Sequence, residues 1–288
     1  MASDLPEWKL YSLELDDSGK EIGNFFESKG YPLKRAVLHP KTKCQLINDP
    51  VLPEKVEAII KEAVPEKGRV LALSSHGSYH HLTYGLCKRA DKLSTEYGYI
   101  HIDRHNDMFG MVMDKRIPEI HCGMFVGKIC ENTNVGKRKF RPDVFFVGSC
   151  VPLLEGLLSP QAIHYAFTGT KDSALSDLLC SFDRHLDRLP EDVYISIDLD
   201  VLAPSEVRTA WDRGSMTAGR LYELVEKIKS RKAIISADII GYTTDDTPFS
   251  AYDGEYDILT SDIRDAEEPS FERSMKVYTT LVDIIRRN

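Results

Sequence analysis

Three side chains of the types that bind metal ions follow one apolar segment of the chain. The stretch 97–110 reads YGYIHIDRHNDMFG, in which Asp103, His105 and Asp107 alternate with other residues directly after a β-branched run. Carboxylate oxygens combined with imidazole nitrogens suit Mn, Fe, Co or Zn ions. Taken alone, such a stretch is as typical of a surface turn, so its meaning depends on the rest of the sequence.

Two further segments repeat this combination of residue types. The sequence GSYHHLTYG carries His80 and His81, and the sequence SIDLDVLAP carries Asp198 and Asp200. Residues two apart in an extended chain point to the same side, so the two aspartates can face one crevice.

All three segments follow runs that read as β-strands, and this shared position predicts a single site. Ligands of an open parallel sheet collect outside the carboxyl ends of its strands. Six ligands exceed the need of one catalytic ion, which favours two ions bridged by carboxylates and by a water made nucleophilic at neutral pH. The predicted metal ligands are His80, Asp103, His105, Asp107, Asp198 and Asp200.

The remaining histidines are interpreted as structural. His39, His164 and His185 are expected to be solvated or packed against neighbours. His101 lies inside the strand expected before Asp103, so we expect it to be a core histidine with a hydrogen-bonding partner.

Short runs rich in Val and Ile alternate with segments of helical period, which is the pattern of a parallel sheet wrapped by helices. The expected strands are 69–75, 98–103, 143–149, 192–200 and 232–240.

Helices are expected at 55–64 and 81–98. A further helix should begin after Thr217 as its N-cap, and the last should run from about Ser270. Apolar residues recur at helical spacing on one face of this last helix. They are Met275, Tyr278, Val282 and Ile285.

The composition predicts a globular protein with a large core. The 288 residues are 42% hydrophobic and 28% charged, and no repeat or linker interrupts them, so we expect one domain over 1–288. The net charge of −8, with both signs mixed, argues against nucleic-acid and anionic membrane partners. The absence of a long apolar run or a signal-like start, and six scattered cysteines, predict a cytoplasmic location.

The three segments resemble motifs of the ureohydrolases, which include arginase, agmatinase and formiminoglutamase. GSYHHLTYG is similar to their Gly-Gly-Asp-His motif, with His80 at the histidine. IHIDRHNDMFG resembles Asp-x-His-x-Asp, and SIDLDVLAP resembles Ser-x-Asp-x-Asp-x-x-Asp-Pro, from which it departs at Ala203. The resemblance covers about residues 68 to 242 in the right order.

The resemblance implies an α/β fold of three layers, α/β/α, with a mostly parallel eight-stranded sheet. It also implies two divalent ions of the Mn²⁺ type and a trimer or hexamer of identical chains. His80, Asp103, Asp107 and Asp200 would bind one ion, and His105, Asp103, Asp198 and Asp200 the other, with Asp103 and Asp200 shared. Asp107 would also orient the bridging hydroxide.

The departures from the family fall on the substrate side. Gly241 stands where the family usually has a glutamate that pairs with the substrate cation, and Phe109 replaces an asparagine that helps to hold free arginine. A buried cation needs a charged partner, so another acid should substitute. The candidates are Asp245 and Asp246, which we favour because they lie closest to Gly241, and Asp253 and Glu255 in the same acidic segment.

The proton shuttle is displaced as well. Arginases place a histidine before a glycine after the metal motif, whereas here Cys122 precedes Gly123 and His121 lies one residue earlier. His121 is the candidate shuttle, and Cys122 is expected to be an ordinary buried thiol.

Two hypotheses for function follow. The first is a hydrolase with two metal ions that cleaves a linear C–N bond in a guanidino or amidine compound other than free arginine, such as a larger guanidino compound or an arginine within a peptide. The alternative is a non-catalytic, metal-binding or regulatory member of the family. An acid over the metal ions would favour the enzyme, and a crevice blocked by Phe109 or Tyr242 would favour the alternative.

Overall fold

The architecture comes from a computed structural model that describes most of the chain. The described residues are 6–38, 51–65, 67–108, 119–135, 144–148, 162–165, 175–209, 211, 213–244 and 269–287.

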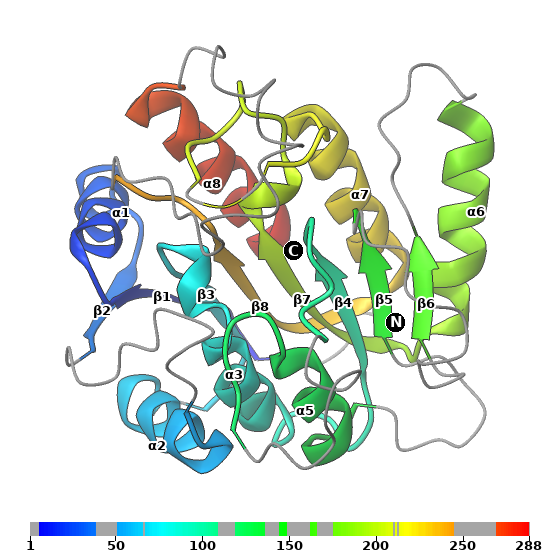
Figure 1. Ribbon diagram of the computed structural model, residues 1–288, viewed down its shortest axis with the longest axis horizontal. Helices are drawn as coiled ribbons and strands as arrows, with labels where there is room; N and C mark the ends of the chain where they lie inside the picture. The colour runs from blue at the N-terminus through cyan, green and yellow to red at the C-terminus, as the bar shows by residue number, and fades with distance from the viewer. Residues whose placement is uncertain are drawn as a thin grey trace, which may run out of the picture.

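Eight parallel strands form one sheet (Figure 1), which confirms the expected α/β class and strand number. The order across the sheet is β2-β1-β3-β8-β7-β4-β5-β6. The central strands β3, β8, β7 and β4 are buried on both faces, as expected of nearly continuous apolar runs. The strands are β1 (Lys9–Glu14), β2 (Leu33–Val37), β3 (Val70–Leu73), β4 (Gly98–Ile102), β5 (Val144–Val147), β6 (Ala162–Tyr165), β7 (Asp192–Asp198) and β8 (Ala233–Ile240).

Helices cover both faces of this sheet and complete the three layers. Helices α1, α6, α7 and α8 pack on one face, and α2, α3 and α5 on the other (Figure 1). The alternation of side chains along a strand supplies both cores, since Leu71 and Leu73 face the first and Val70 and Ala72 the second. The helices are α1 (Asp17–Ser28), α2 (Pro53–Ala63), α3 (Leu82–Ala90), α5 (Phe125–Asn132), α6 (Leu175–Arg188), α7 (Ala218–Arg231) and α8 (Phe271–Arg286), with the short 3₁₀ helices η2 (Gly77–Tyr79) and η3 (Leu199–Val201).

The predicted N-cap of α7 is confirmed, and α8 begins after Ser270, close to the expected start. Thr217 Oγ1 accepts the backbone N–H of Arg220 at 3.3 Å at the start of α7, and Ser270 Oγ accepts that of Arg273 at 3.2 Å at the start of α8. The predicted apolar face of α8 is buried against the sheet. Its residues are Met275, Tyr278, Val282 and Ile285.

The five expected strands are present, but the helix expected at 81–98 is shorter and ends at Ala90. A turn follows, in which Asp91 Oδ1 accepts hydrogen bonds from the Asn134 backbone N–H at 2.8 Å and the Tyr97 hydroxyl at 3.1 Å. These contacts direct the chain into β4 instead of prolonging the helix.

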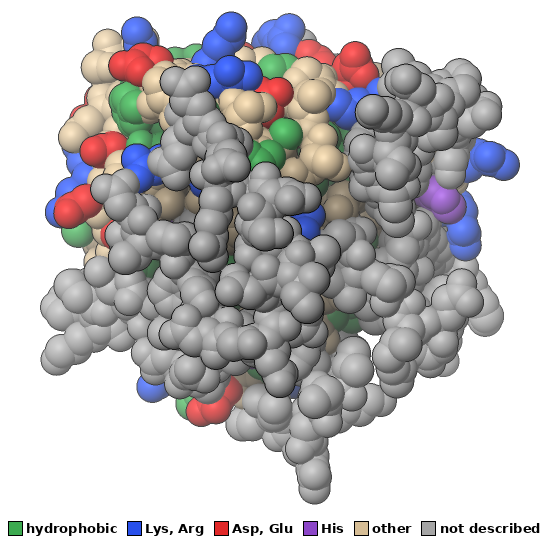
Figure 2. Space-filling model, turned by 45° about the horizontal axis from the view of Figure 1, so that its top comes forward, with side chains coloured by type: hydrophobic (Ala, Val, Ile, Leu, Met, Phe, Trp, Pro, Cys, Tyr) green, Lys and Arg blue, Asp and Glu red, His purple; other side chains and the backbone are tan. Residues whose placement is uncertain are grey.

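Charged side chains of both signs are interspersed on the described surface that Figure 2 shows. Among the described residues, no helix combines the length and the apolar character that a membrane span requires.

Candidate metal centre

The carboxyl ends of β3, β4 and β7 carry the predicted metal ligands. His80 follows η2 after β3, Asp103 directly follows β4, Asp198 is the last residue of β7 and Asp200 lies in η3. Because these strands run parallel, the side chains meet at one edge of the sheet.

Local hydrogen bonds fix two of the aspartates. Asp103 Oδ1 accepts the backbone N–H of His105 at 2.5 Å, and Asp198 Oδ1 accepts that of Asp200 at 3.0 Å. Each bond closes a tight turn between a strand and the next ligand. The two-residue spacing seen in the sequence therefore sets the direction of the side chains.

Asp107 is held in an unusual backbone conformation. Its φ is 48°, the one positive value among the described residues other than glycine. Its carbonyl accepts the backbone N–H of Val126 in α5 at 3.1 Å. Non-glycine residues persist in this region only where the surrounding structure holds them, and here α5 does so.

A first group of ligand atoms surrounds His80. Its Nδ1 lies 3.1 Å from Asp103 Oδ2, 3.1 Å from Asp107 Oδ2 and 3.4 Å from Asp198 Oδ2. His80, Asp103 and Asp198 are almost completely buried, and Asp107 is buried as well.

A second group surrounds His105. Its Nδ1 lies 2.9 Å from Asp200 Oδ2 and 3.5 Å from Asp103 Oδ1. Asp103 therefore offers one oxygen to each group, as expected of a carboxylate that bridges two ions. The six predicted ligands lie together in one cluster.

The charges of this cluster fit divalent cations. Burial raises the pKa of Asp198 well above its usual value, and the charges of Asp200 and Asp103 raise it further. Burial and the charge of Asp103 raise the pKa of Asp200 to about 6. Burial opposes the charged form of His80, but hydrogen bonds to Asp103 and Asp107 raise its pKa well above the usual value. Buried carboxylates this close must hold protons unless cations compensate them.

The contacts pair the aspartates differently from the expected arrangement. Asp198 lies beside His80, whereas Asp200 Oδ2 contacts His105. Asp198, the last residue of β7, thus lies in the His80 group, and Asp200 in η3 lies in the His105 group. Asp103 is the carboxylate with one oxygen in each group.

A buried hydrogen-bond network orients His80 from behind. His80 Nε2 lies 2.8 Å from Ser196 Oγ, and Ser196 donates to Asp238 Oδ2 at 3.1 Å. Asp238 also accepts hydrogen bonds from Thr83 at 2.9 Å and from Tyr194 at 2.7 Å. Partners of this kind fix the ring orientation and the tautomer of a metal ligand. This network was not predicted from the sequence, although Ser196 and Asp238 lie in two of the expected strands.

His101 was expected to be a core histidine with a partner, and this is confirmed in part. Its ring is fully buried, and Nδ1 lies 3.1 Å from the Tyr99 hydroxyl. Its other nitrogen, however, points to the cluster, 3.2 Å from Asp103 Oδ2. The available signal was its position two residues before Asp103, which places both side chains on one face of the strand.

Of the other histidines, His185 packs with its ring centroid 5.9 Å from that of Phe145, as expected. His39 and the side chain of His164 lie outside the described part of the chain.

His121, the predicted proton shuttle, is 5% exposed. Its Nδ1 accepts the backbone N–H of Gly123 at 3.1 Å, so the proton of the neutral ring lies on Nε2. Burial lowers the pKa of His121 to about 4, so the ring is neutral at pH 7. No contact within the described residues joins His121 to the cluster.

Cys122, the next residue after His121, lies close enough to the cluster for the charges there to affect its pKa. Burial and the charge of Asp107 raise the pKa of Cys122 to about 12, while the charge of His105 opposes the rise. The thiol is buried and stays protonated, as expected.

Gly241 lies against Asp198, where the family resemblance would place a glutamate. Its φ is 120°, and its N–H donates to the Ser75 carbonyl at 2.7 Å. A Cβ atom at this position would lie 2.5 Å from Asp198 Oδ1 and 2.9 Å from the Leu199 nitrogen. A larger residue here would displace a predicted metal ligand.

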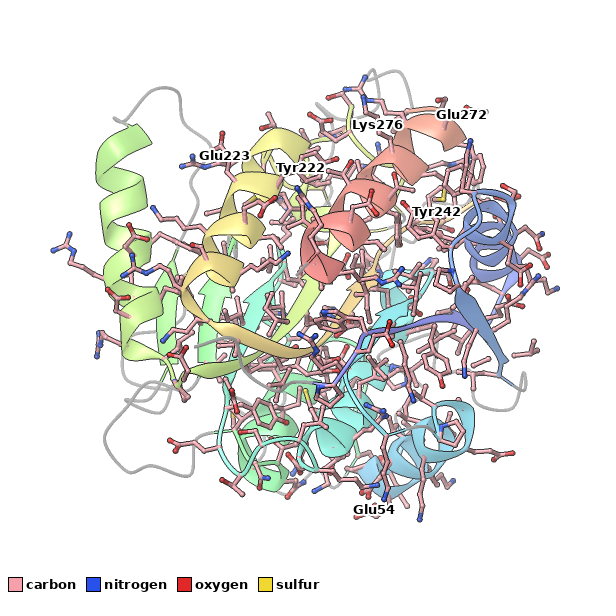
Figure 3. All side chains as sticks on the ribbon, turned by 180° about the vertical axis from the view of Figure 1, so that it is seen from behind. Glu54, Tyr222, Glu223, Tyr242, Glu272 and Lys276 are labelled. Carbon is pink, nitrogen blue, oxygen red and sulfur yellow. The ribbon has the colours of Figure 1, made fainter. Side chains whose placement is uncertain are left out.

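Tyr242 does not cover the cluster. Its hydroxyl donates to Glu21 Oε2 at 3.2 Å, and its ring packs against Phe271, so the side chain lies between α1 and α8 (Figure 3). The other substrate-side residues, all outside the described part of the chain, are Phe109, Asp245, Asp246, Asp253 and Glu255.

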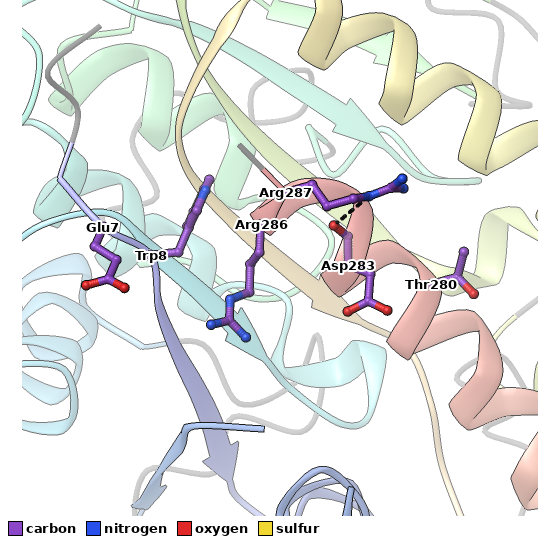
Figure 4. Close-up of a pocket in the computed structure, with 6 residues that line it drawn as sticks. All are labelled: Glu7, Trp8, Thr280, Asp283, Arg286 and Arg287. Carbon is purple, nitrogen blue, oxygen red and sulfur yellow. Dashed lines mark hydrogen bonds between the residues drawn. The ribbon is translucent and has the colours of Figure 1, made fainter. Parts of the chain in front are cut away.

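A surface hollow lies at the opposite edge of the sheet (Figure 4). Trp8, which lines it, directly precedes β1, so the hollow is at the amino ends of the strands and away from the cluster. Its lining residues are Glu7, Trp8, Thr280, Asp283, Arg286 and Arg287.

The model of the arginase family matches residues 24–245, which is more than three quarters of the chain. No curated protein matches the sequence.

Solved structures share the fold at low sequence identity. The arginase from Bacillus subtilis has a TM-score of 0.63 at 17% identity, covering 99% of each chain. The proclavaminate amidino hydrolase from Streptomyces clavuligerus has a TM-score of 0.63 at 10% identity, covering 98% of this chain and 92% of that one. The agmatine ureohydrolase of Thermoplasma volcanium has a TM-score of 0.60 at 12% identity, covering 98% and 89%. At these identities the likeness shows a common fold.

Proposed function

The chain belongs to the arginase family, and on this premise we propose that it is a metal-dependent hydrolase of a linear C–N bond in a guanidino or amidine compound. The observation that carries the proposal is the buried cluster at the strand ends, in which Asp103 joins two groups of ligand atoms. Folding alone does not require four carboxylates and their imidazole partners to be buried together, because their desolvation is costly.

The proposed cofactor is a pair of divalent ions, with Mn²⁺ as the expected metal. His80, Asp103, Asp107 and Asp198 would hold one ion, and His105, Asp103, Asp198 and Asp200 the other. Divalent ions in such a site lower the pKa of bound water and polarise the bond to be cleaved.

Two residues have proposed roles in moving or directing protons. Asp107, fixed by its contact with α5, accepts a hydrogen bond from the attacking water and so orients it. His121 carries its proton on Nε2. As the proposed proton shuttle, it would pass this proton to the departing amine and would take the proton of the attacking water in its place.

The substrate is proposed to be a guanidino or amidine compound other than free arginine. Gly241 provides no carboxylate, and its contact with Asp198 leaves no room for one. The charged partner of the substrate cation would then be Asp245 or Asp246. A larger guanidino compound or an arginine within a peptide would suit a site without the contacts to a free amino acid.

One observation favours the alternative of a non-catalytic, metal-binding or regulatory member. Gly241 packs on Asp198 and so supports the metal cluster, while the position has lost its acid. A chain that retains both ions without turning over any guanidino compound would fit this alternative.

The test is a screen of guanidino and amidine compounds with protein loaded with Mn²⁺, Ni²⁺, Co²⁺ or Zn²⁺, in which released urea or ammonia is measured. We expect turnover of at least one compound and none with the Asp103→Asn variant, in which the shared carboxylate is lost. Full metal content without turnover across the screen would contradict the enzyme and support the alternative.

We also propose that the chain forms a trimer or hexamer in the cytoplasm, in keeping with the family resemblance. Light scattering after size-exclusion chromatography would give the mass of the assembly directly.

A further inference from the structure

His101 stands next to the cluster without belonging to the six predicted ligands. It lies in β4, fully buried, two residues before Asp103 and therefore on the same face of the strand. Its Nε2 is 3.2 Å from Asp103 Oδ2 and 3.5 Å from Asp107 Oδ2. The ring stacks on that of His80, with centroids 5.2 Å apart and planes 18° apart. Two imidazoles thus face the same pair of carboxylates.

These separations match those between ligands of one ion. Two donor atoms about 2.1 Å from a metal, at right angles or tetrahedrally placed, are about 3.0 to 3.4 Å from each other. The contacts of His101 Nε2 with Asp103 and Asp107, and those of His80 Nδ1 with the same two oxygens, fall in or next to this range.

The buried network sets the direction of the hydrogen bonds behind the His80 ring. Asp238 is an acceptor, and Ser196 donates its single hydroxyl proton to it. Ser196 Oγ must therefore accept from His80 Nε2. In the neutral form of the ring, which is the form that binds metal ions, His80 then presents the lone pair of Nδ1 to the carboxylates.

The Tyr99 hydroxyl is the hydrogen-bonding partner of His101 at Nδ1. Its oxygen can accept from His101 Nδ1, 3.1 Å away. The lone pair of His101 Nε2 is then left facing Asp103, and Nε2 has no hydrogen-bond partner within the described residues. A lone pair directed at a carboxylate oxygen is repulsive unless a proton or a metal ion lies between them.

We propose that His101 Nε2 is a direct ligand of the ion that His80 binds, so that this ion has two imidazole ligands. The inference rests on the metal site of the proposed function but on no substrate. Imidazole favours Co²⁺, Ni²⁺ and Zn²⁺ relative to a site made of carboxylates, so the two ions should differ in metal preference.

The test is the proton NMR spectrum of the full-length protein loaded with two equivalents of Co²⁺. Each imidazole bound to Co²⁺ gives a strongly shifted, exchangeable N–H signal. We expect three such signals, from His80, His101 and His105. Two signals would mean that His101 only hydrogen-bonds to the carboxylates and would overturn the inference. Failure to take up any Co²⁺ would overturn the metal site itself.

The His101→Gln variant provides a second test, because glutamine keeps a hydrogen-bonding group without an imidazole. We expect the loss of one shifted signal, a changed visible spectrum of bound Co²⁺ and a weakening of the first site by at least about 100-fold. Three signals in this variant would contradict the inference. His185→Gln is the matched control, since His185 packs on Phe145 away from the cluster, and it should leave the spectrum and the affinity unchanged.

Discussion

Gly241 occupies the position of the family's substrate-binding glutamate and lies directly against the predicted metal ligand Asp198. A glutamate at this position would need a Cβ 2.5 Å from Asp198 Oδ1 and a φ of 120°, which side chains larger than glycine rarely adopt. The backbone of the chain is therefore adapted to glycine here, and restoring an acid would disturb a metal ligand.

Gly241→Ala tests this coupling. We expect the free energy of unfolding to fall by more than about 2 kcal/mol, because backbone strain adds to the collision with Asp198. Bound metal, measured by mass spectrometry after dialysis, should fall as well.

Gly30→Ala is the control for Gly241→Ala. Gly30 also has a positive φ, of 77°, but within the described residues nothing lies within 4 Å of the added Cβ. It should lose only about 1 to 2 kcal/mol and keep its metal content. Equal metal content in the two variants would contradict the coupling.

A second prediction for a single residue concerns the stability of the protein at low pH. Burial lowers the pKa of His81 to about 3, and neither of its ring nitrogens has a hydrogen-bond partner in the described structure. Below about pH 6.5 the unfolded chain takes up a proton that folded His81 does not, so the free energy of unfolding falls as the pH falls from about 6.5 to 3. The slope from this residue is up to about 1.4 kcal/mol per pH unit.

Denaturant unfolding between pH 7 and 4 measures this slope. His81→Leu should flatten the curve, since leucine does not titrate and leaves no polar atom unsatisfied. His185→Leu, on a partly exposed helix position, should change the slope much less. An unchanged slope in His81→Leu would show that other groups control the acid sensitivity.

At the scale of elements, the sequence predicts the central strands well because they are buried on both faces and read as continuous apolar runs. The strands β1, β2 and β6 were not identified individually; β1 and β2 contain charged residues, and their pairing depends on distant parts of the chain.

The candidate metal centre could likewise be predicted from the sequence only in part. The predicted ligands meet because residues at strand ends share one edge of a parallel sheet, a rule that needs no coordinates. The pairing of Asp198 with His80, and the approach of His101, depend on side-chain directions across three strands, which spacing in the sequence does not determine.

The packing of α3 on α2 gives a prediction at this scale. Gly85→Ala in the middle of α3 would normally stabilise a helix by about 1 kcal/mol. Here the added Cβ would lie 2.6 Å from Ile60 Cγ1 and 2.9 Å from the Val56 carbonyl oxygen, so we expect net destabilisation, measured by thermal unfolding.

Gly219→Ala in α7 is the matched substitution, because among the described residues nothing lies within 4 Å of its added Cβ. It should be neutral or stabilising. A stabilising effect of Gly85→Ala would show that α2 moves without cost.

For the molecule as a whole, the metal centre joins segments that are far apart in the sequence. His80 follows β3, Asp103 follows β4 and Asp198 ends β7, so bound ions would connect three strands at one edge of the sheet. Without cations, the same place concentrates buried negative charge, which opposes folding. Metal binding should therefore contribute directly to global stability.

The Asp198→Asn variant should therefore be more stable than the original chain without metal and less stable than it with metal. Burial, Asp200 and Asp103 raise the pKa of Asp198 well above its usual value, so the free energy of unfolding falls as the pH rises above about 3.9, the pKa of this group in the unfolded chain. Asparagine removes the charge and can still accept the Asp200 N–H, so without metal the variant should unfold at a higher temperature than the original chain. With metal at 100 times its dissociation constant, the original chain gains about 2.7 kcal/mol for each ion bound, and the variant, which lacks a carboxylate proposed to bind both ions, should gain much less. Thermal unfolding with a chelator and with added Mn²⁺ should thus rank the two proteins in opposite orders.

The same order in both conditions would contradict this prediction. It would mean either that the cluster is not strained without metal or that Asp198 is not shared between the ions. The metal content of the variant would tell these two explanations apart.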